Sequence, residues 1–500
     1  SKEDYNVETE GKIWDESSRK AHWKNRKPGQ PFFAVFNHTI SHESKIRNRP
    51  HILVHDPAKA RVPAYHPDTP EVRHDWAQYY DRITEMDALV GKNLKELAEA
   101  GLSEDTIIFY YGDHGSGMPR SKRWPYNSGL QVPLVIYIPP KFRSLASSDY
   151  RTDGESDRLV SFVDFAPTLL SLAGIEPPEH MQGYAFLGQY QTKPQDYLFG
   201  FRGRMDERYD LVRSVRNKRF VYIRNYMPHK EYGQYLNYMF QTPTTQVWKR
   251  MYDAGELVPP QTYFWETKPS EELYDLQKDQ DEVKNLVDSD EHQGVLNELR
   301  KAQHQKLLAI RDLGFMPEAE IHRLADGKAP YLIGHDSELY PLPEVLAMAD
   351  LASSQKTNAQ AELLAGLKDE NDVVRYWAAM GILIRGKQAV QQAAPQLRAA
   401  LQDSSKSVRC IAAEALGRYG NQQDVNAGVE TLISLANQKK DGLYVAMLAL
   451  NGLDKLGPKK VAAVKDQIAK LPVKNDQVNR RLQSYVARLI ERLQEQQEQN

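Results

Sequence analysis

The chain has 500 residues, 41% of them hydrophobic, which is enough for a large core spread over two or three domains. Its 65 Lys and Arg residues nearly balance 67 Asp and Glu residues, so the composition gives no sign of a nucleic-acid partner. The single cysteine, Cys410, excludes an internal disulfide framework and a cysteine-based zinc site. No apolar stretch approaches the roughly 20 residues of a membrane span. We therefore expect a globular protein without a membrane span.

Two apolar runs of strand type, at residues 31–37 and 107–111, flank a predicted helix. Thr69 predicts its N-cap and Pro70 its first position, and apolar residues recur at three- and four-residue steps up to Gly101. The order strand, helix, strand predicts a right-handed crossover within a parallel sheet. The ends of both strands would then lie at one edge of the sheet, where sites in open α/β sheets are found.

The second run stops at Gly112–Gly115, a turn that contains Asp113 and His114. An acid and an imidazole at the end of a buried strand are candidate metal ligands, although a capping acid and a surface histidine would give the same pattern. The first run is followed by His38 and His42, a loop-borne pair that could equally be two surface histidines.

Three cations follow the Asp-His turn: Arg120, Lys122 and Arg123. Cations beside a metal-type turn are what an anion-binding site needs, whereas a solvated basic loop is the commoner reason for three such charges. Residues 132–138 predict another strand, and residues 159–174 predict an apolar helix that Gly174 closes.

Alternating residues at 209–215 and 220–223 predict a hairpin around a short polar turn. Residues 226–270 are rich in aromatic side chains and proline with little periodicity, which favours a long packed excursion. A last short strand is expected at 271–276, followed by a helical pattern over 280–313.

From about Leu342 the composition shifts to Ala, Leu and Gln, and a repeat occurs. Asp372–Arg375 is followed by Gly386, and Lys406–Arg409 is followed by Gly420, with an offset of 34 residues between the two copies. Helix pairs of this kind must stack to bury their apolar faces. The segment resembles HEAT repeats, and a plain helical bundle is the alternative.

Five segments of the chain resemble segments of the sulfatase family, in the alkaline phosphatase superfamily, and occur in the family order. They are 31–44, 112–115, 122–135, 160–183, and 272–276 together with 285–286. The resemblance is closest to glycan-active bacterial sulfatases and covers about half of the chain.

The resemblance implies an α/β fold with a mostly parallel sheet flanked by helices, then a small C-terminal sheet subdomain and an all-α HEAT-like domain. We expect the α/β core at 1–195, the subdomain with its aromatic-rich excursion at 196–335, and the helical repeats at 342–500.

The resemblance also implies roles for four residues. Asp113 and His114 would bind a divalent cation, calcium in most of the family. His42 would donate a proton to the leaving oxygen, and Lys122 would neutralise the sulfate. His114 stands where the family often has asparagine, and imidazole suits transition metals better than calcium.

One family feature is absent from this sequence. The nucleophile of sulfatases lies in a motif of Cys or Ser, any residue, Pro, Ser and Arg, where it matures to formylglycine, and paired aspartates complete the metal site. Cys410 is followed by Ile-Ala and lies among the helical repeats. We therefore expect that the chain begins partway through a sulfatase domain, that the formylglycine lies on a missing N-terminal segment, and that these 500 residues alone do not turn over a sulfate ester.

The implied substrate is a sulfated carbohydrate, cleaved at a sulfate ester or an N-sulfate. The candidate sugar contacts are His38, Glu43, Arg120, Arg123, Arg204 and Asp206. Each could equally be a salt-bridged surface residue. The helical repeats either cover one side of the catalytic domain or build a homo-oligomer, and the resemblance implies a periplasmic or secreted location.

Two alternatives to a sulfatase remain. One is a phosphonate or phosphodiester hydrolase of the same superfamily, because Asp-His turns bind its metals too. The other is a non-catalytic binding protein that uses the helical repeats as its interaction surface, although the cations at Arg120, Lys122 and Arg123 argue mildly against it.

Overall fold

The computed structural model describes residues 11–498 and divides the chain into two compact units. The first unit comprises Ser1–Val62 and Asp68–Thr106, and the second comprises Pro63–Pro67 and Ile107–Asn500. The three-part division expected from the sequence stays a prediction. Among the described helices, none is long and apolar enough to cross a membrane.

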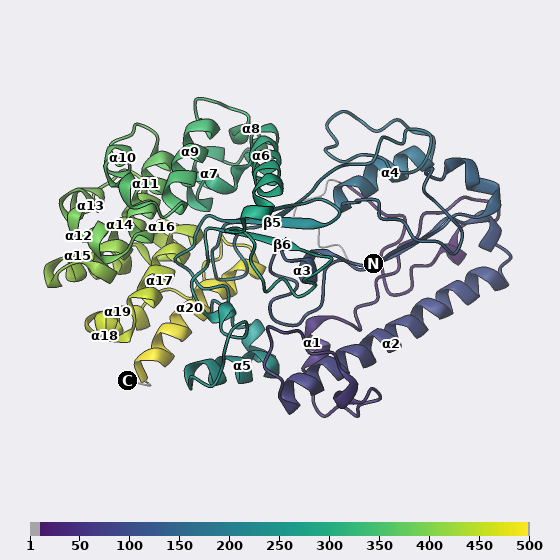
Figure 1. The fold of residues 1–500 in the computed structure, drawn as a ribbon, viewed down its shortest axis with the longest axis horizontal. Helices are drawn as coiled ribbons and strands as arrows, with labels where there is room; N and C mark the ends of the chain where they lie inside the picture. Colours follow the sequence, from purple (N-terminus) through teal and green to yellow (C-terminus); the bar gives the residue numbers. More distant parts are fainter. Residues whose placement is uncertain (1–10, 499–500) are drawn as a thin grey trace. The chain divides into compact units, whose positions relative to one another are not determined.

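The first unit is built around the long helix α2 (Pro70–Glu99), which Figure 1 shows as one unbroken rod. The Thr69 side chain caps it by accepting a hydrogen bond from the backbone N–H of Val72 at 3.4 Å. The helix stops before Gly101, whose φ of +67° is a conformation that favours glycine. The predicted helix and both of its ends are therefore confirmed. The short helix α1 (Glu43–Ile46) packs on α2.

The predicted strand at residues 31–37 is wrong, because these residues form no strand. Their aromatic side chains stack on nearby tryptophans instead, with ring centroids 5.6 Å apart for Phe32 and Trp23 and 5.8 Å apart for Phe33 and Trp14. An apolar run becomes a strand only where a neighbouring strand pairs with its backbone, and within residues 11–498 this run has no such neighbour.

The second unit begins with a pair of strands, β1 (Ile108–Tyr111) and β2 (Leu134–Tyr137), which lie where the sequence predicts strands. They pair antiparallel, with Ile108 opposite Tyr137 and Tyr111 opposite Leu134. The expected crossover between parallel strands at residues 31–37 and 107–111 is therefore wrong, because residues 31–37 form no strand and the described partner of β1 is the antiparallel strand β2. Helix α4 (Phe165–Leu172) is shorter than predicted and packs Phe165 against Phe109 of β1.

A four-stranded antiparallel sheet follows, and it contains the predicted hairpin and the predicted last strand. Its strands, in spatial order, are β3 (Leu198–Arg202), β4 (Val212–Arg216), β5 (Phe220–Asn225) and β6 (Glu271–Asp275). The Asn217 side chain closes the turn between β4 and β5 by accepting from the N–H groups of Arg219 and Phe220 at 2.9 and 2.7 Å. The expected small sheet subdomain is thus confirmed.

The excursion between β5 and β6 contains a helix that the sequence analysis did not predict, α5 (Pro243–Asp253). Trp248 of α5 is fully buried and stacks on Phe264, with ring centroids 4.6 Å apart. Aromatic packing therefore holds this segment as a compact cover over one face of the sheet. On the other side, helix α6 (Gln293–Ala309) is shorter than the predicted 280–313.

The rest of the chain is helical, as expected for the repeats. The helices are α7 (Glu318–Ala325), α8 (Pro330–Gly334), α9 (Leu342–Ser353), α10 (Gln360–Gly366), α11 (Asp372–Ile384), α12 (Lys387–Gln392), α13 (Ala394–Ala400), α14 (Lys406–Tyr419), α15 (Gln422–Leu435), α16 (Gln438–Asp441), α17 (Leu443–Leu456), α18 (Pro458–Val461), α19 (Lys465–Ala469) and α20 (Arg480–Glu498).

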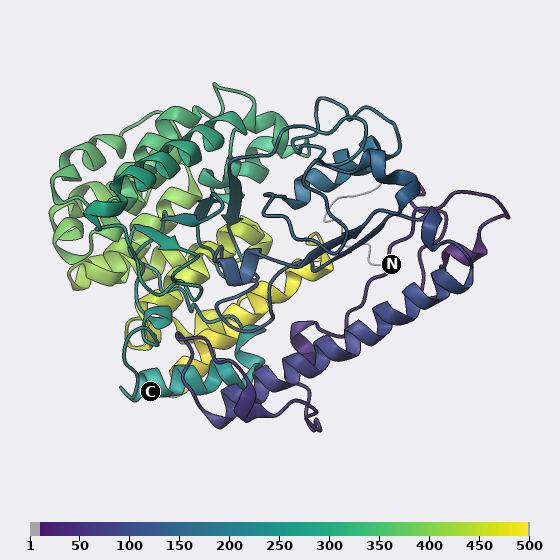
Figure 2. The ribbon, with the colours of Figure 1, turned by 45° about the vertical axis from the view of Figure 1, so that its right-hand side comes forward.

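The two copies of the sequence repeat fall on α11 and α14. Asp372 and Lys406 are the first residues of these helices, and Asn371 and Ser405 cap them through their side chains. Helices α9, α11, α14, α17 and α20 pack in succession, which Figure 2 shows as a stack of neighbouring rods. Each helix thereby buries the apolar face of the next, as the repeat requires.

Candidate active site

The Asp-His turn follows β1 directly and is fixed by a close backbone approach. Gly115 donates its backbone N–H to the carbonyl oxygen of Gly129 at 2.9 Å. A Cβ at position 115 would collide with the carbonyl oxygen of Ser128, so only glycine fits there. The turn is therefore held against helix α3 (Asn127–Leu130) by contacts that do not involve the Asp113 and His114 side chains.

The geometry of the two side chains suits a metal ligand pair. The Nδ1 atom of His114 lies 2.7 Å from the carbonyl oxygen of Gly115, and its Nε2 lies 3.8 Å from Oδ1 of Asp113. A hydrogen bond from Nδ1 to a backbone carbonyl is the usual way in which a ligating histidine is oriented, with Nε2 left to bind the metal. One cation at about 2.0 to 2.4 Å from each atom would fit a span of 3.8 Å.

The donor set fits a divalent cation in part. Imidazole nitrogen and carboxylate oxygen together suit zinc and other transition metals, whereas calcium prefers oxygen ligands. Within residues 11–498, no group of three or more His, Cys, Asp or Glu side chains is placed to hold a metal ion. The structure therefore offers two ligands on one turn, with the Asp113 side chain 72% exposed.

Lys122 lies on the same loop as the Asp-His turn. Its backbone N–H donates to the carbonyl oxygen of Ser116 at 3.2 Å, and the Ser116 and Ser121 hydroxyl oxygens are 2.9 Å apart. The loop from β1 to α3 thus closes on itself, and the predicted metal ligands and the predicted sulfate-binding lysine share one small framework. The Lys122 residue is half-buried.

Arg120 has a different environment from the one expected of a sugar contact. It is 6% exposed, and its guanidinium donates to the carbonyl oxygens of Asp281 and Glu282 at 3.0 and 2.7 Å. The same group lies 4.3 and 3.8 Å from the ring centroids of Tyr65 and Tyr126. These contacts make Arg120 an anchor of the loop, and its burial argues against direct contact with a glycan.

A second anchor of the loop was not foreseen from the sequence. The Glu272 carboxylate, fully buried on β6, accepts hydrogen bonds from the hydroxyls of Tyr126, Tyr232 and Tyr274 at 2.6 to 2.8 Å. The side-chain amide of Asn225 donates a fourth bond at 2.6 Å. These residues are separated by up to 146 positions, so no local pattern could have indicated their association.

The remaining candidate contacts of this unit lie where the four-stranded sheet meets the helical repeats. The Arg123 guanidinium pairs with the Asp206 carboxylate at 3.9 Å. Arg204 instead pairs with Glu318 of α7 at 2.7 Å and lies over the ring of Tyr485 of α20. The structure thus brings Arg123 and Asp206 together and turns Arg204 toward the repeats.

Three further candidates belong to the first unit. The Nδ1 of His42, the N-cap of α1, accepts from the N–H of Ser44 at 3.3 Å. In a neutral imidazole the proton is then on Nε2, which is the tautomer that can donate a proton from that atom. His38 lies 3.0 Å from the Asn93 amide nitrogen and its burial lowers its pKa, while Glu43 is 1% exposed, which argues against a sugar contact.

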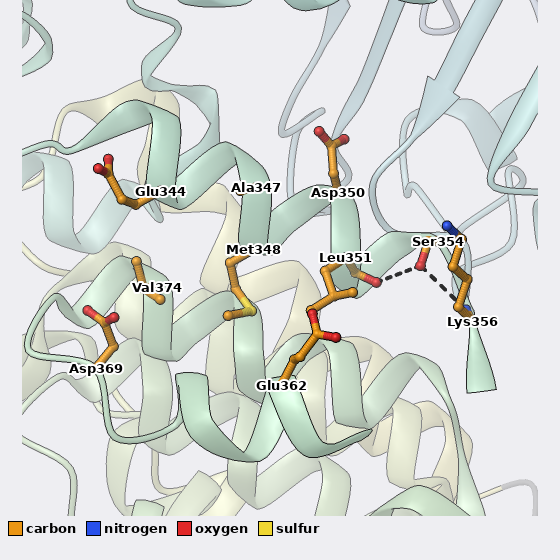
Figure 3. Close-up of a pocket in the computed structure, with 10 residues that line it drawn as sticks. All are labelled: Glu344, Ala347, Met348, Asp350, Leu351, Ser354, Lys356, Glu362, Asp369 and Val374. Carbon is orange, nitrogen blue, oxygen red and sulfur yellow. Dashed lines mark hydrogen bonds between the residues drawn. The ribbon is translucent and has the colours of Figure 1, made fainter. Parts of the chain in front are cut away.

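A groove of about 510 Å³ lies apart from these residues, between helices α9, α10 and α11. Figure 3 shows the carboxylates of Glu344, Asp350, Glu362 and Asp369 around it, with Lys356 as the basic residue. Such a lining repels anions, because four acids outnumber one lysine. The groove is therefore unsuited to a sulfated ligand.

Two parts of the chain match known protein families. Residues 3–175 match the sulfatase family model, and residues 360–451 match the model of HEAT repeats. These matches agree with the predicted sheets flanked by helices and with the predicted nature of the repeats, whereas all the described strands pair antiparallel.

Individual relatives agree with this assignment. The chain is 41% identical over 365 residues to an ulvan-active sulfatase of Formosa agariphila, covering 65% of this chain and 60% of that protein. It is 27% identical over 266 residues to the N-sulphoglucosamine sulphohydrolase of Homo sapiens, covering 49% of this chain and 50% of that protein. The chain thus spans between half and three fifths of the length of these relatives.

A solved structure of a protein in complex with its substrate D-glucosamine-2-N,6-O-disulfate matches with a TM-score of 0.31 and 20% identity, covering 47% of this chain and 40% of that one.

Proposed function

We propose that this protein hydrolyses sulfate esters or N-sulfates of a sulfated glycan. The observation that carries the proposal is the 41% identity over 365 residues to an ulvan-active sulfatase. The similarity to an N-sulphoglucosamine sulphohydrolase supports a sulfated sugar as the substrate class. The chemistry of the loop from Asp113 to Lys122 agrees with this substrate, because it combines candidate ligands of a cation with a lysine.

The resemblance to sulfatases implies the roles of the residues. Asp113 and His114 would hold a divalent cation, for which the resemblance implies calcium and the imidazole ligand favours a transition metal. Charge on the sulfuryl oxygens would be withdrawn by a cation held there and neutralised by the ammonium group of Lys122. The Nε2–H of His42 would donate a proton to the leaving oxygen.

Sulfatases generally use a formylglycine nucleophile as well as a metal. The sequence contains no Cys or Ser followed by any residue, Pro, Ser and Arg, so the residues present do not fit formylglycine.

The test is a comparison of substrates. The full translation product of the gene would be incubated with ulvan oligosaccharides and with a phosphodiester, and the released sulfate and phosphate would be measured. We expect sulfate release to exceed phosphodiester cleavage by at least about 100-fold. Phosphodiester cleavage without sulfate release would favour the phosphodiester hydrolase, and no release from either would favour a binding protein.

We also propose a periplasmic or secreted location, which rests on family resemblance. Cell fractionation followed by immunodetection checks this, and a cytosolic protein would contradict it. A homo-oligomer built by the repeats stays a prediction, which light scattering of the purified protein would test.

A further inference from the structure

Residues 204–208 form a turn between β3 and β4, the latch turn. Its ends are paired by the backbone N–H of Met205 and carbonyl oxygen of Arg208, 2.8 Å apart, and by the reverse bond of 2.9 Å. At its tip, Asp206 has a φ of +49°, in the left-handed region. Its carbonyl oxygen accepts a hydrogen bond from Nη1 of Arg204 at 2.9 Å. Aspartate adopts this conformation more readily than most residues other than glycine, so it suits the tip of a tight turn.

The helical repeats hold the latch turn through buried charges. Nη1 of Arg208 lies 2.8 Å from both Oδ1 of Asn451 and Oδ2 of Asp454, on α17, and Arg208 is 1% exposed. The amide of Asn451 also donates to the carbonyl oxygen of Glu207 at 3.0 Å. A buried charge cannot leave its partner without a large desolvation penalty, so α17 fixes the position of the turn.

Two more helices contact the same turn. The carboxylate of Glu207, which is also buried, lies 3.4 Å from Nη1 of Arg488 on α20. The guanidinium of Arg204 pairs with Glu318 on α7 at 2.7 Å. Three residues of a five-residue turn are therefore bound by three helices of the repeats.

The tip of the turn faces the loop that carries Lys122. The Asp206 carboxylate lies 3.9 Å from Nη2 of Arg123, the residue after Lys122. Arg202, at the end of β3, donates to the carbonyl oxygen of Arg123 and lies over the ring of Trp124. The Arg123 side chain is only 7% exposed, whereas that of Asp206 is 30% exposed and can meet a ligand.

We propose that the helical repeats act in substrate recognition by holding Asp206 as a specificity contact on Arg123, the residue after Lys122. This rests on the proposed function, in which Lys122 binds the sulfate group. The Asp206 carboxylate accepts a hydrogen bond from a sugar hydroxyl next to that group and repels a second sulfate at the same place. Asn451, Asp454 and Arg488 are positioning residues, which act through the latch turn.

The first test compares the affinities of the chain for ulvan oligosaccharides before and after chemical oversulfation, by titration calorimetry. The wild-type chain is expected to bind the native oligosaccharides more tightly than the oversulfated ones. Asp206→Asn is expected to reduce this ratio of affinities about tenfold, which is the effect of losing one charge-assisted hydrogen bond or one charge repulsion. An unchanged preference in Asp206→Asn would overturn the proposal.

The positioning role is tested with Asp454→Asn and with Arg208→Lys, which keeps the charge but loses the Nε donor to the carbonyl oxygen of Tyr235 at 2.7 Å. Both are expected to shift the preference in the same direction as Asp206→Asn. The matched control is Asp403→Asn, which breaks a pair with Arg375 inside the repeats at 2.8 Å, and the Asp403 side chain is about as exposed as that of Asp454, 11% against 10%. A shift in the control as large as that in Asp454→Asn would overturn the positioning role.

A readout without substrate separates this proposal from the proposed function. Labelling of Arg123 with phenylglyoxal, followed by mass spectrometry, is expected to be at least threefold faster in Asp454→Asn than in the wild type and unchanged in Asp403→Asn. If the labelling rate of Arg123 is unchanged in Asp454→Asn, the positioning of the latch turn by α17 is overturned, whatever the sulfatase activity of the variant. A wild-type chain that binds no sulfated oligosaccharide overturns the sugar contact, whereas the proposed function is overturned only when the full translation product of the gene releases no sulfate.

Discussion

The Nδ1 of His114 lies 2.7 Å from the carbonyl oxygen of Gly115, the next residue in the chain. A carbonyl oxygen can only accept a hydrogen bond, so the proton of the neutral ring is on Nδ1 and Nε2 keeps its lone pair. That lone pair is the donor a metal requires, and the Asp113 carboxylate is 3.8 Å away. The carbonyl group of Gly115 thereby orients the His114 ring so that Nε2 can bind a metal ion.

We expect His114→Ala to weaken binding of Zn²⁺ by about 10- to 100-fold, because one of two ligands on the turn is lost. Titration calorimetry with Zn²⁺ and with Ca²⁺ measures this and shows which ion binds more tightly. The control is His335→Ala, since His335 is exposed and its Nδ1 likewise contacts a carbonyl oxygen, that of Tyr331, at 2.9 Å. Equal losses in the two variants would contradict the assignment.

Glu282 should make stability depend on pH. Burial raises its pKa to about 7, against an ordinary 4.5, although Arg120 and the N–H of Asn127 lower it. Between these two pH values the folded protein keeps a proton that the unfolded chain releases. The stabilisation of the folded state by Glu282 is therefore complete below pH 4.5 and is lost as the pH rises through 7. The loss is on the order of 3 kcal/mol.

Glu282→Gln is therefore expected to flatten the fall in melting temperature between pH 5 and pH 8, as measured by thermal unfolding. A variant whose melting temperature falls in parallel with that of the wild type would show that Glu282 ionises normally.

The buried Glu272 should be a strong stability determinant. Glu272→Ala leaves three tyrosine hydroxyls and one amide without an acceptor, with a cost of more than about 3 kcal/mol, and Tyr232→Phe removes one donor for about 1 kcal/mol. Denaturant unfolding measures both. Tyr197→Phe is the control, because its hydroxyl contacts Glu298 at 2.7 Å in an exposed setting, and it should change stability by less than about 0.5 kcal/mol. If Tyr197→Phe lowered the free energy of unfolding as much as Tyr232→Phe, the stabilising role of the buried hydrogen bonds to Glu272 would be contradicted.

Close packing of α14 and α15 requires a glycine at position 428. A Cβ there would lie 2.5 Å from the carbonyl oxygen of Ala413, which is backbone and cannot move aside. We expect Gly428→Ala to destabilise the protein by about 1 to 3 kcal/mol. Gly294→Ala in α6 has nothing within 4 Å of its Cβ and should be neutral or slightly stabilising. Calorimetric melting of the two variants compares them, and similar effects would argue against a packing constraint.

Local signals explain which elements could be predicted. The helix α2 has its N-cap at Thr69, its first-turn proline at Pro70 and its stop at Gly101, so its ends follow from the sequence alone. The repeat helices α11 and α14 are equally explicit, since the residues that begin them recur at the 34-residue offset. In both cases the physical cause acts within a few residues of the chain.

Pairing between distant segments could not be predicted in the same way. Residues 31–37 have the composition of a strand, but they lack a partner in the described part of the chain. The direction in which β2 pairs with β1 depends on the path of the loop between them, which composition does not specify. Helix α5 was missed because it is short and lies in an aromatic-rich stretch, although Val247, Trp248, Met251 and Tyr252 recur at helical spacing along it.

The candidate site shows the same division. Asp113, His114 and Lys122 were identified by motif and lie on one loop. The environment of Arg120 was not foreseen, because it depends on Asp281 and Glu282, more than 150 residues later in the chain. Of the latch turn, only Arg204 and Asp206 are candidates from the sequence, because the partners of the turn lie on the distant helices α7, α17 and α20.

The most direct test of the central claim is the release of sulfate from ulvan oligosaccharides by the full translation product of the gene, wild type against Lys122→Ala. We predict sulfate release by the wild type and a loss of at least about 100-fold in the variant, because a preorganised cation at the developing charge is worth several kcal/mol. Lys249→Ala, which removes an exposed lysine paired with Asp253, should leave the rate unchanged. Wild-type sulfate release that persists undiminished in Lys122→Ala, or no sulfate release at all, would contradict the account.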